Sequence, residues 1–112
     1  NIHMPLDHKT KGFEPKKDHK INKWYRLQLD CYTLLLKRNN YGVNNKGFIV
    51  YYYPDKGKLH NGVPFKTSVH KVRTNPKRAK RIFKAAVNCV KGKKPDPSPD
   101  CSVCNYVRKR TK

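Results

Sequence analysis

Four residues in the first third of the chain could together build half of a metal-dependent phosphodiester-cleaving site. Asp7 and Lys9 are one residue apart, and on a β-strand such residues point to the same face. Gln28 and Tyr32 are four residues apart, which places them on one face of an α-helix. A carboxylate can hold a hard cation such as Mg²⁺, and a neighbouring lysine can position water and stabilise developing negative charge.

The charge of the chain indicates the kind of partner that such a site would meet. Lys and Arg number 27 against seven Asp and Glu, for a formal net charge of +20 over 112 residues. So many like charges repel one another in a compact state unless an anion screens them, and nucleic acid is the expected anion. An anionic membrane surface is the rival, and a basic surface that only keeps the protein soluble is the simplest alternative.

No stretch approaches the roughly 18 apolar residues of a transmembrane helix. Binding of the basic second helix to a membrane surface is not expected either, because the apolar face of that helix is needed for the core. No apolar leader opens the chain, and a cytoplasmic location is therefore expected.

Hydrophobic periodicity and turn residues predict five elements. Gly, Asn and Pro separate them, with a basic loop at 11–20 and a polar turn at 56–62. The predicted order is a strand at 2–9 that Pro5 bends, a helix at 21–39, strands at 48–53 and 63–72, and a helix at 76–90. Asn75 and Pro76 have the types of an N-cap and a first helical residue. This order predicts an α/β domain with a small mixed sheet.

Each predicted helix carries an apolar stripe that we expect to face the core. In the first helix the stripe is Trp24, Leu27, Cys31, Leu34 and Leu35. In the second helix it is Ala79, Ile82, Phe83, Ala86, Val87 and Val90.

Two groups of basic residues are the expected nucleic-acid contacts, one in the loop after the first strand and one on the second helix. They are Lys11, Lys16, Lys17, Lys77, Arg78, Lys80, Arg81 and Lys84. The five histidines show no metal-ligand spacing, and His70 is expected at the surface.

The two motifs occur in the order and at the spacing of a known family. The segment Asp-His-Lys-Thr at 7–10 is followed by a variable basic loop, and then by Tyr25, Gln28 and Tyr32 on a helix that leads into an apolar strand. This arrangement resembles the RecB-type exonuclease branch of the PD-(D/E)XK nuclease superfamily. In that branch the strand carries (Asp/Glu)-x-Lys and the next helix carries Tyr-x-x-Gln-x-x-x-Tyr. The resemblance covers most of residues 6–106.

The resemblance implies a fold and a reaction. The fold is a restriction-endonuclease-like mixed sheet flanked by helices, forming a single domain over residues 1–112. The reaction is DNA cleavage with Mg²⁺ or Mn²⁺, held by Asp7 and by the carbonyl of His8. Lys9 would be the catalytic lysine, while Gln28 and Tyr32 would orient DNA phosphates or that lysine.

The sequence departs from the family at one point. The family's earlier metal-binding acid has no counterpart, because none of the six residues before Asp7 is Asp or Glu. We therefore expect the chain to be the C-terminal part of the domain, to need a partner chain that supplies the acid, or to be a degenerate copy. A partial domain is favoured, since half a sheet cannot bury its face alone.

The cysteines near the C-terminus suggest a second metal site. Cys101 and Cys104 have the spacing of a metal knuckle, and Cys89 could be a third ligand. Residues 93–112 are expected to form a proline-rich linker, this knuckle and a basic tail. The resemblance implies an iron–sulfur cluster at such cysteines; Zn²⁺ is the other candidate, and free thiols are the alternative.

A different class of function also fits the composition. A small basic protein of the ribosomal type, with a zinc knuckle and no catalysis, would have the same charge and the same cysteine pair. That hypothesis leaves the pairing of Asp7 and Lys9 with Gln28 and Tyr32 unexplained.

Overall fold

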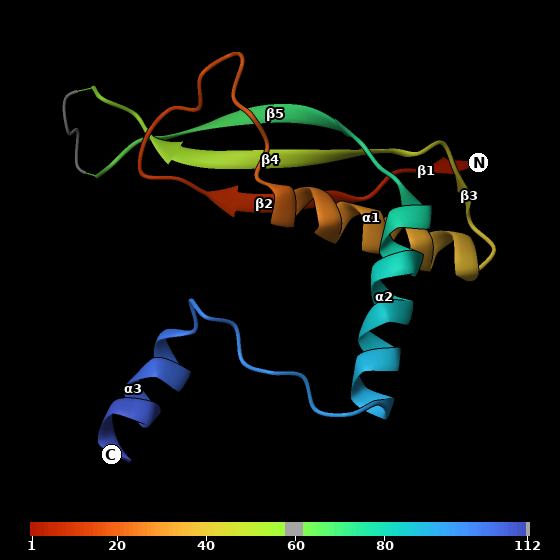
Figure 1. Cartoon of the computed structure of the whole chain (residues 1–112). Coiled ribbons are helices and arrows are strands. Elements are labelled where there is room, and N and C mark those ends of the chain that lie inside the picture. The colour runs from red at the N-terminus through yellow and green to blue at the C-terminus, as the bar shows by residue number, and fades with distance from the viewer. Residues whose placement is uncertain (58–61, 112) are drawn as a thin grey trace. The chain divides into compact units, whose positions relative to one another are not determined.

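The computed structural model describes residues 1–57 and 62–111, so most of the polar turn predicted at 56–62 lies outside the described residues. The chain forms two compact units, Asn1–Ile82 and Phe83–Lys112 (Figure 1).

A mixed three-stranded sheet is the base of the first unit. In it β2 (Leu6–Thr10) runs parallel to β4 (Lys46–Pro54), and β4 pairs antiparallel with β5 (Phe65–Arg73). The strand order is β2-β4-β5, which makes β4 the central strand. Its β-branched and aromatic residues suit a strand that packs on a core.

A second, short sheet consists of two parallel strands. It joins β1 (Ile2–His3) to β3 (Gly42–Val43). Pro5 lies between β1 and β2, and its carbonyl accepts a hydrogen bond from the backbone N–H of Phe48 at 2.9 Å. The strand predicted at 2–9 is therefore two strands, because proline has no N–H to continue a ladder.

Helix α1 (Lys23–Arg38) covers one face of the sheet (Figure 1). Its first turn is capped by Asn22, whose side-chain oxygen accepts a hydrogen bond from the N–H of Trp24 at 2.8 Å. The core between helix and sheet is small and closely packed. Its four buried residues are Leu29 of α1, Ile49 and Tyr51 of β4, and Val72 of β5.

The face that α1 turns to the core differs from the predicted stripe. The helix itself is confirmed, but Trp24 is 63% exposed and Cys31 is also exposed. The buried residues are instead Leu29, Asp30 and Thr33. The apolar spacing did not predict this face, because Asp30 and Thr33 have partners from distant segments. Those partners satisfy their hydrogen bonds and allow both residues to be buried.

Helix α2 (Pro76–Lys91) begins in the first unit and continues into the second. The predicted start is confirmed, because the side-chain oxygen of Asn75 accepts a hydrogen bond from the N–H of Arg78 at 3.2 Å. Within the helix only Pro76 and Ala79 are buried. The prediction that its whole apolar stripe faces the core is therefore wrong.

Helix α3 (Ser102–Arg110) occupies the region predicted as a knuckle and basic tail. Cys101 caps it, with its sulfur 3.4 Å from the N–H nitrogen of Cys104. Within the described residues, no helix has the length and apolar character needed to cross a bilayer.

Candidate functional site

Asp7 and Lys9 lie on β2 and face α1. Their register partners on β4 are Ile49 and Tyr51, both buried in the core beneath the helix. Paired residues of neighbouring strands share a face, so the acid and the lysine project beneath α1 as the alternation predicted. β2 is an edge strand of the sheet, and the side chains of Asp7 and Lys9 are only partly exposed, at 18% and 21%.

The ammonium group of Lys9 joins the strand motif to the helix motif. Its nitrogen is 2.8 Å from Asp7 Oδ2 and donates a hydrogen bond to Gln28 Oε1, also at 2.8 Å. It lies 4.5 Å from the centre of the Tyr25 ring, within range of a cation–π interaction. Three partners on two elements therefore hold one cation in place.

Gln28 continues this chain of hydrogen bonds along α1. Its amide nitrogen donates to the hydroxyl of Tyr32 at 2.7 Å, one helical turn further on. This contact orients the amide so that its oxygen faces Lys9 and its nitrogen faces Tyr32. The structure thus brings all four predicted catalytic residues, Asp7, Lys9, Gln28 and Tyr32, into one connected group.

The donor set of this group matches a divalent cation only in part. Asp7 Oδ2 is buried and makes no hydrogen bond of good geometry with the described residues, although it is ion-paired with Lys9. Such an oxygen suits a hard cation. Across residues 1–57 and 62–111, however, no three His, Cys, Asp or Glu side chains converge as a metal site. The residues present therefore supply one carboxylate ligand of a Mg²⁺ or Mn²⁺ site and not the complete set.

The side chain of His8 lies on the opposite face of β2. Its ring is 5.4 Å from that of Tyr52, measured between centroids. Only the backbone carbonyl of His8 can therefore serve the site, as the resemblance implied, and that role stays a prediction.

A second polar cluster surrounds Tyr51 on the same face of the sheet, and sequence reasoning missed it. His19 and His70 each pack edge-on against the Tyr51 ring, at 5.4 and 5.3 Å between centroids. The Lys11 nitrogen is 2.9 Å from His19 Nε2, and Ser68 Oγ is 2.7 Å from His70 Nε2. The loop after β2 brings His19 here, which no local spacing indicates.

The cluster changes the protonation of its members. Burial, followed by the positive charge of Lys11, lowers the pKa of His19 below the ordinary value of 6.5. Burial also raises the pKa of Tyr51, whose hydroxyl is buried without a hydrogen-bond partner among the described residues. The lowered pKa favours the uncharged imidazole of His19.

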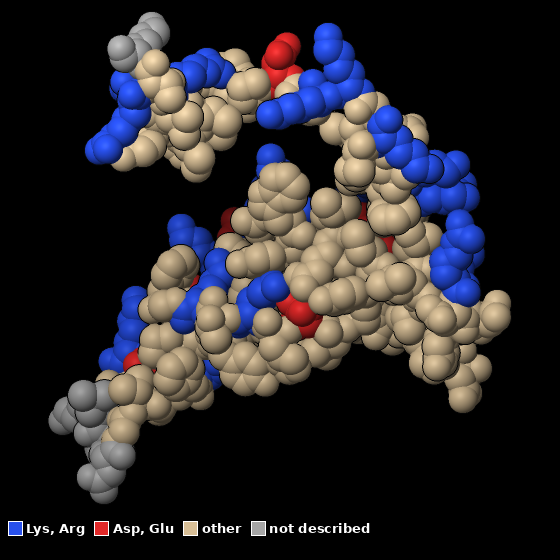
Figure 2. All heavy atoms as spheres, turned by 90° about the horizontal axis from the view of Figure 1, so that it is seen from below, with Lys and Arg blue, Asp and Glu red and all other residues tan. Residues whose placement is uncertain are grey.

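Most of the predicted nucleic-acid contacts are exposed side chains. On the face shown in Figure 2, lysines and arginines are numerous and acidic residues are few. Lys11 belongs to the Tyr51 cluster, and Arg78 is paired with the buried carboxylate of Asp30. The remaining predicted contacts are exposed, namely Lys16, Lys17, Lys77, Lys80, Arg81 and Lys84.

The C-terminal cysteines do not converge as predicted. Cys101 and Cys104 lie together at the start of α3, but no third side chain joins them in a metal-binding group among the described residues. Cys89 is an exposed residue of α2. A cluster or Zn²⁺ at these cysteines stays a prediction.

The thiols of the pair have different acidities. The backbone N–H of Cys104, and then its side chain, lower the pKa of Cys101, because both donate hydrogen bonds to its sulfur. The pKa of Cys104 is raised, first by its side-chain hydrogen bond to Cys101. Cys101 is therefore the more readily ionised thiol of the pair.

An edge strand carries a carboxylate and a lysine, and the lysine is hydrogen-bonded to a glutamine on the next helix, which is the arrangement that the resemblance implied. The sequence profile of the PD-(D/E)XK nuclease superfamily matches residues 4–108 of this chain, and the chain belongs to that superfamily. The mixed sheet with its helices confirms the restriction-endonuclease-like α/β class that was expected. No curated protein and no solved structure gives a significant match.

Proposed function

We propose that this chain carries the lysine half of a metal-dependent DNA nuclease site, of the RecB-type exonuclease branch. The single observation that supports this most strongly is the position of Lys9, shared between Asp7 and Gln28 at 2.8 Å each. A lysine that served only solubility would not need two partners on separate elements. The high positive charge supports a nucleic acid as the substrate, and the resemblance favours DNA.

The residues of the site have distinct tasks in this proposal. Asp7 is the carboxylate that would hold a divalent cation, with the carbonyl of His8 as a second contact. When bound, such a cation polarises the phosphodiester and lowers the pKa of a water molecule. Lys9 positions the attacking water and stabilises the charge that develops on the phosphate. Gln28 and Tyr32 fix the direction in which the lysine points.

The proposal requires a further acidic ligand near Asp7. We propose that another part of the protein or a partner chain supplies it. On one side β2 pairs with β4, and its other edge has no partner strand among the described residues. A strand added there would bring a side chain about 5 Å from Asp7 on the same face.

The experiment is a cleavage assay of the complete domain, together with the part or partner chain that supplies the further acid, on labelled single-stranded and double-stranded DNA with Mg²⁺ or Mn²⁺. Cleavage should require the metal and should be abolished by Lys9→Ala, while DNA affinity stays within about tenfold, since only one cation among many is removed. Lys93→Ala is the matched control, because Lys93 is an exposed lysine outside the predicted nucleic-acid contacts.

Two results would contradict the proposal. Cleavage that persists in Lys9→Ala would remove the lysine from the mechanism. Tight DNA binding by the complete domain without cleavage under any metal would favour the non-catalytic nucleic-acid binder. Counting the nucleotides released from each labelled end then tests the exonuclease mode.

A further inference from the structure

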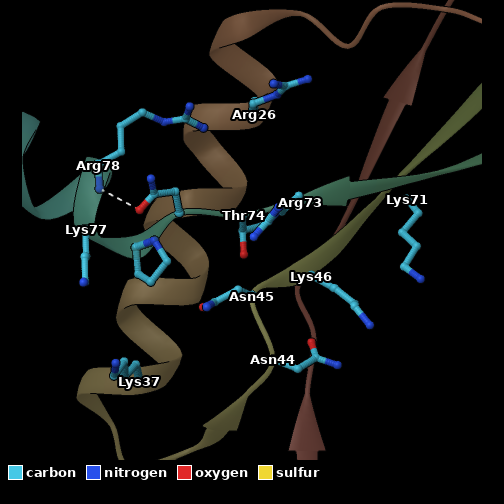
Figure 3. Close-up of a pocket in the computed structure, with 12 residues that line it drawn as sticks. Arg26, Lys37, Asn44, Asn45, Lys46, Lys71, Arg73, Thr74, Lys77 and Arg78 are labelled. Atoms are coloured by element: carbon cyan, nitrogen blue, oxygen red, sulfur yellow. Dashed lines mark hydrogen bonds between the residues drawn. The ribbon is translucent and has the colours of Figure 1, made fainter.

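A basic groove lies at the end of the sheet where β4 begins and β5 ends. It has a volume of about 1030 Å³, and its lining comes from α1, β4, β5 and the start of α2 (Figure 3). None of its 12 lining residues is acidic. Seven are cationic: Arg26, Lys37, Lys46, Lys71, Arg73, Lys77 and Arg78.

The strand side of the groove sets like charges against each other. Lys46 and Arg73 are directly opposite in the antiparallel ladder between β4 and β5. Like charges in this position destabilise a sheet, because their side chains are close neighbours. Lys71, two residues before Arg73, adds a third cation on the same face of β5. An anion bound between these side chains would remove the repulsion.

The helix side of the groove places cations at the N-terminus of a helix, which is also electrostatically unfavourable. Lys77 and Arg78 occupy the first turn of α2, which has no acidic residue. Cations at this end of a helix are unfavourable, because the exposed N–H groups and the helix dipole already carry positive charge. Both sides of the groove thus place cations where they repel other positive charge. Proteins tolerate such unfavourable local arrangements mainly at functional sites.

In the part of the chain that the structure describes, only one of these seven cations has an ion-pair partner. Three ion pairs form among residues 1–57 and 62–111, and the only groove residue in them is Arg78, bound to Asp30. Asp30 is completely buried, and its other oxygen accepts a hydrogen bond from the N–H of Asn75 at 2.7 Å. Asp30 therefore fixes the first turn of α2 in the wall of the groove and leaves Lys77 without an ion-pair partner.

We propose that this groove binds the phosphate backbone of the nucleic-acid substrate at a distance from the cleavage site. It shares no residue with the group around Lys9, and it lies toward β5, whereas Asp7 and Lys9 stand on β2 at the other edge of the sheet. Lys46 is three positions along β4 from Ile49, the register partner of Asp7, a separation of about 10 Å. Because three is an odd number, the Lys46 side chain projects from the opposite face of the sheet to Asp7 and Lys9. The proposal rests on the proposed function only in taking nucleic acid as the ligand.

The test measures binding without cleavage. Fluorescence anisotropy of a labelled 20-nucleotide single strand is recorded in excess EDTA over a series of salt concentrations. The variant Lys46→Ala/Arg73→Ala should weaken binding about tenfold and reduce the slope of log affinity against log salt by about 0.7 for each phosphate that is no longer neutralised. Lys93→Ala/Lys94→Ala removes the same charge from an exposed segment of the second unit and should change affinity by less than about twofold.

Every outcome bears on the proposal. Equal losses of affinity in the groove variant and the Lys93/Lys94 control would overturn the proposal, because net charge alone would then explain binding. No loss in the groove variant would overturn it too, because the groove cations would then not contact the nucleic acid. If Lys46→Ala/Arg73→Ala fails to fold by circular dichroism, Lys71→Ala/Lys77→Ala replaces it, since both side chains are exposed and lack an ion pair. Because cleavage is absent in EDTA, loss of groove binding and loss of nuclease activity are separate results.

Discussion

The Lys9 ammonium nitrogen lies 2.8 Å from the side-chain oxygen of Gln28, nineteen residues away in the sequence. This contact joins the strand that carries Asp7 to the helix that covers it. A lysine with free rotation would sample many positions, whereas this one is held between a carboxylate, an amide and an aromatic ring. Positioning of this kind is what a catalytic cation requires.

Gln28→Leu should therefore lower kcat for DNA cleavage by about 10- to 100-fold and leave KM nearly unchanged, because it frees Lys9 without removing it. Tyr32→Phe should have a smaller effect, since Gln28 keeps its bond to Lys9. Steady-state cleavage kinetics check both, with urea unfolding in parallel. A fall in kcat that merely follows a loss of folding stability would argue against a positioning role.

Arg78→Ala should destabilise the fold by about 3 kcal/mol, because it leaves the fully buried Asp30 carboxylate without its cation. Urea unfolding followed by circular dichroism measures the change. Lys77→Ala, at the neighbouring exposed position, should stay within about 0.5 kcal/mol of wild type. Equal stability of the two variants would show that the ion pair contributes little.

Folding stability should decrease as the pH falls below 6.5, because the pKa of His19 is lower in the folded chain than in the unfolded one. The unfolded state then binds a proton that the folded state rejects, and above that pH this contribution is fully retained. The groups that face His19 are Lys11, His70, Asp18 and the Tyr51 ring.

Thermal unfolding of wild type and His19→Gln between about pH 5 and pH 8 tests this linkage. The variant should lose part of the pH dependence, whereas His3→Gln, whose ring packs on Tyr41 elsewhere, should keep it. An unchanged slope in His19→Gln would assign the effect to other groups.

Cys101 should react with iodoacetamide faster than Cys104 near neutral pH, because hydrogen bonds at the start of α3 lower its pKa and raise its thiolate fraction. Mass spectrometry of digested samples at successive times gives a rate for each site. Cys104→Ala should slow Cys101, since it removes one of the donors. Similar rates at the two cysteines would contradict this, and protection of both by added Fe or Zn²⁺ would support the predicted metal site.

Much of the site was predictable from local spacing. Period-2 alternation placed Asp7 and Lys9 on one face, and the four-residue separation of Gln28 and Tyr32 placed both on one side of α1. The start of α2 at Pro76 was also predictable, because an N-cap followed by proline acts through nearest neighbours.

The arrangement around these motifs was decided by tertiary structure. Asp30 and Thr33 are buried, while Trp24 is exposed, because partners from the region of β5 and α2 satisfy the polar groups. Arg78 binds Asp30, and the hydroxyl of Thr33, which donates to the Leu29 carbonyl, is hydrogen-bonded to the hydroxyl of Thr74 at 3.0 Å. The cluster around Tyr51 forms because the loop after β2 brings His19 against the Tyr51 ring of β4. Sequence by itself determined which chemical groups share an element, because that depends on local periodicity. Which elements meet, and so which cations gather in one groove, depends on contacts between residues far apart in the chain.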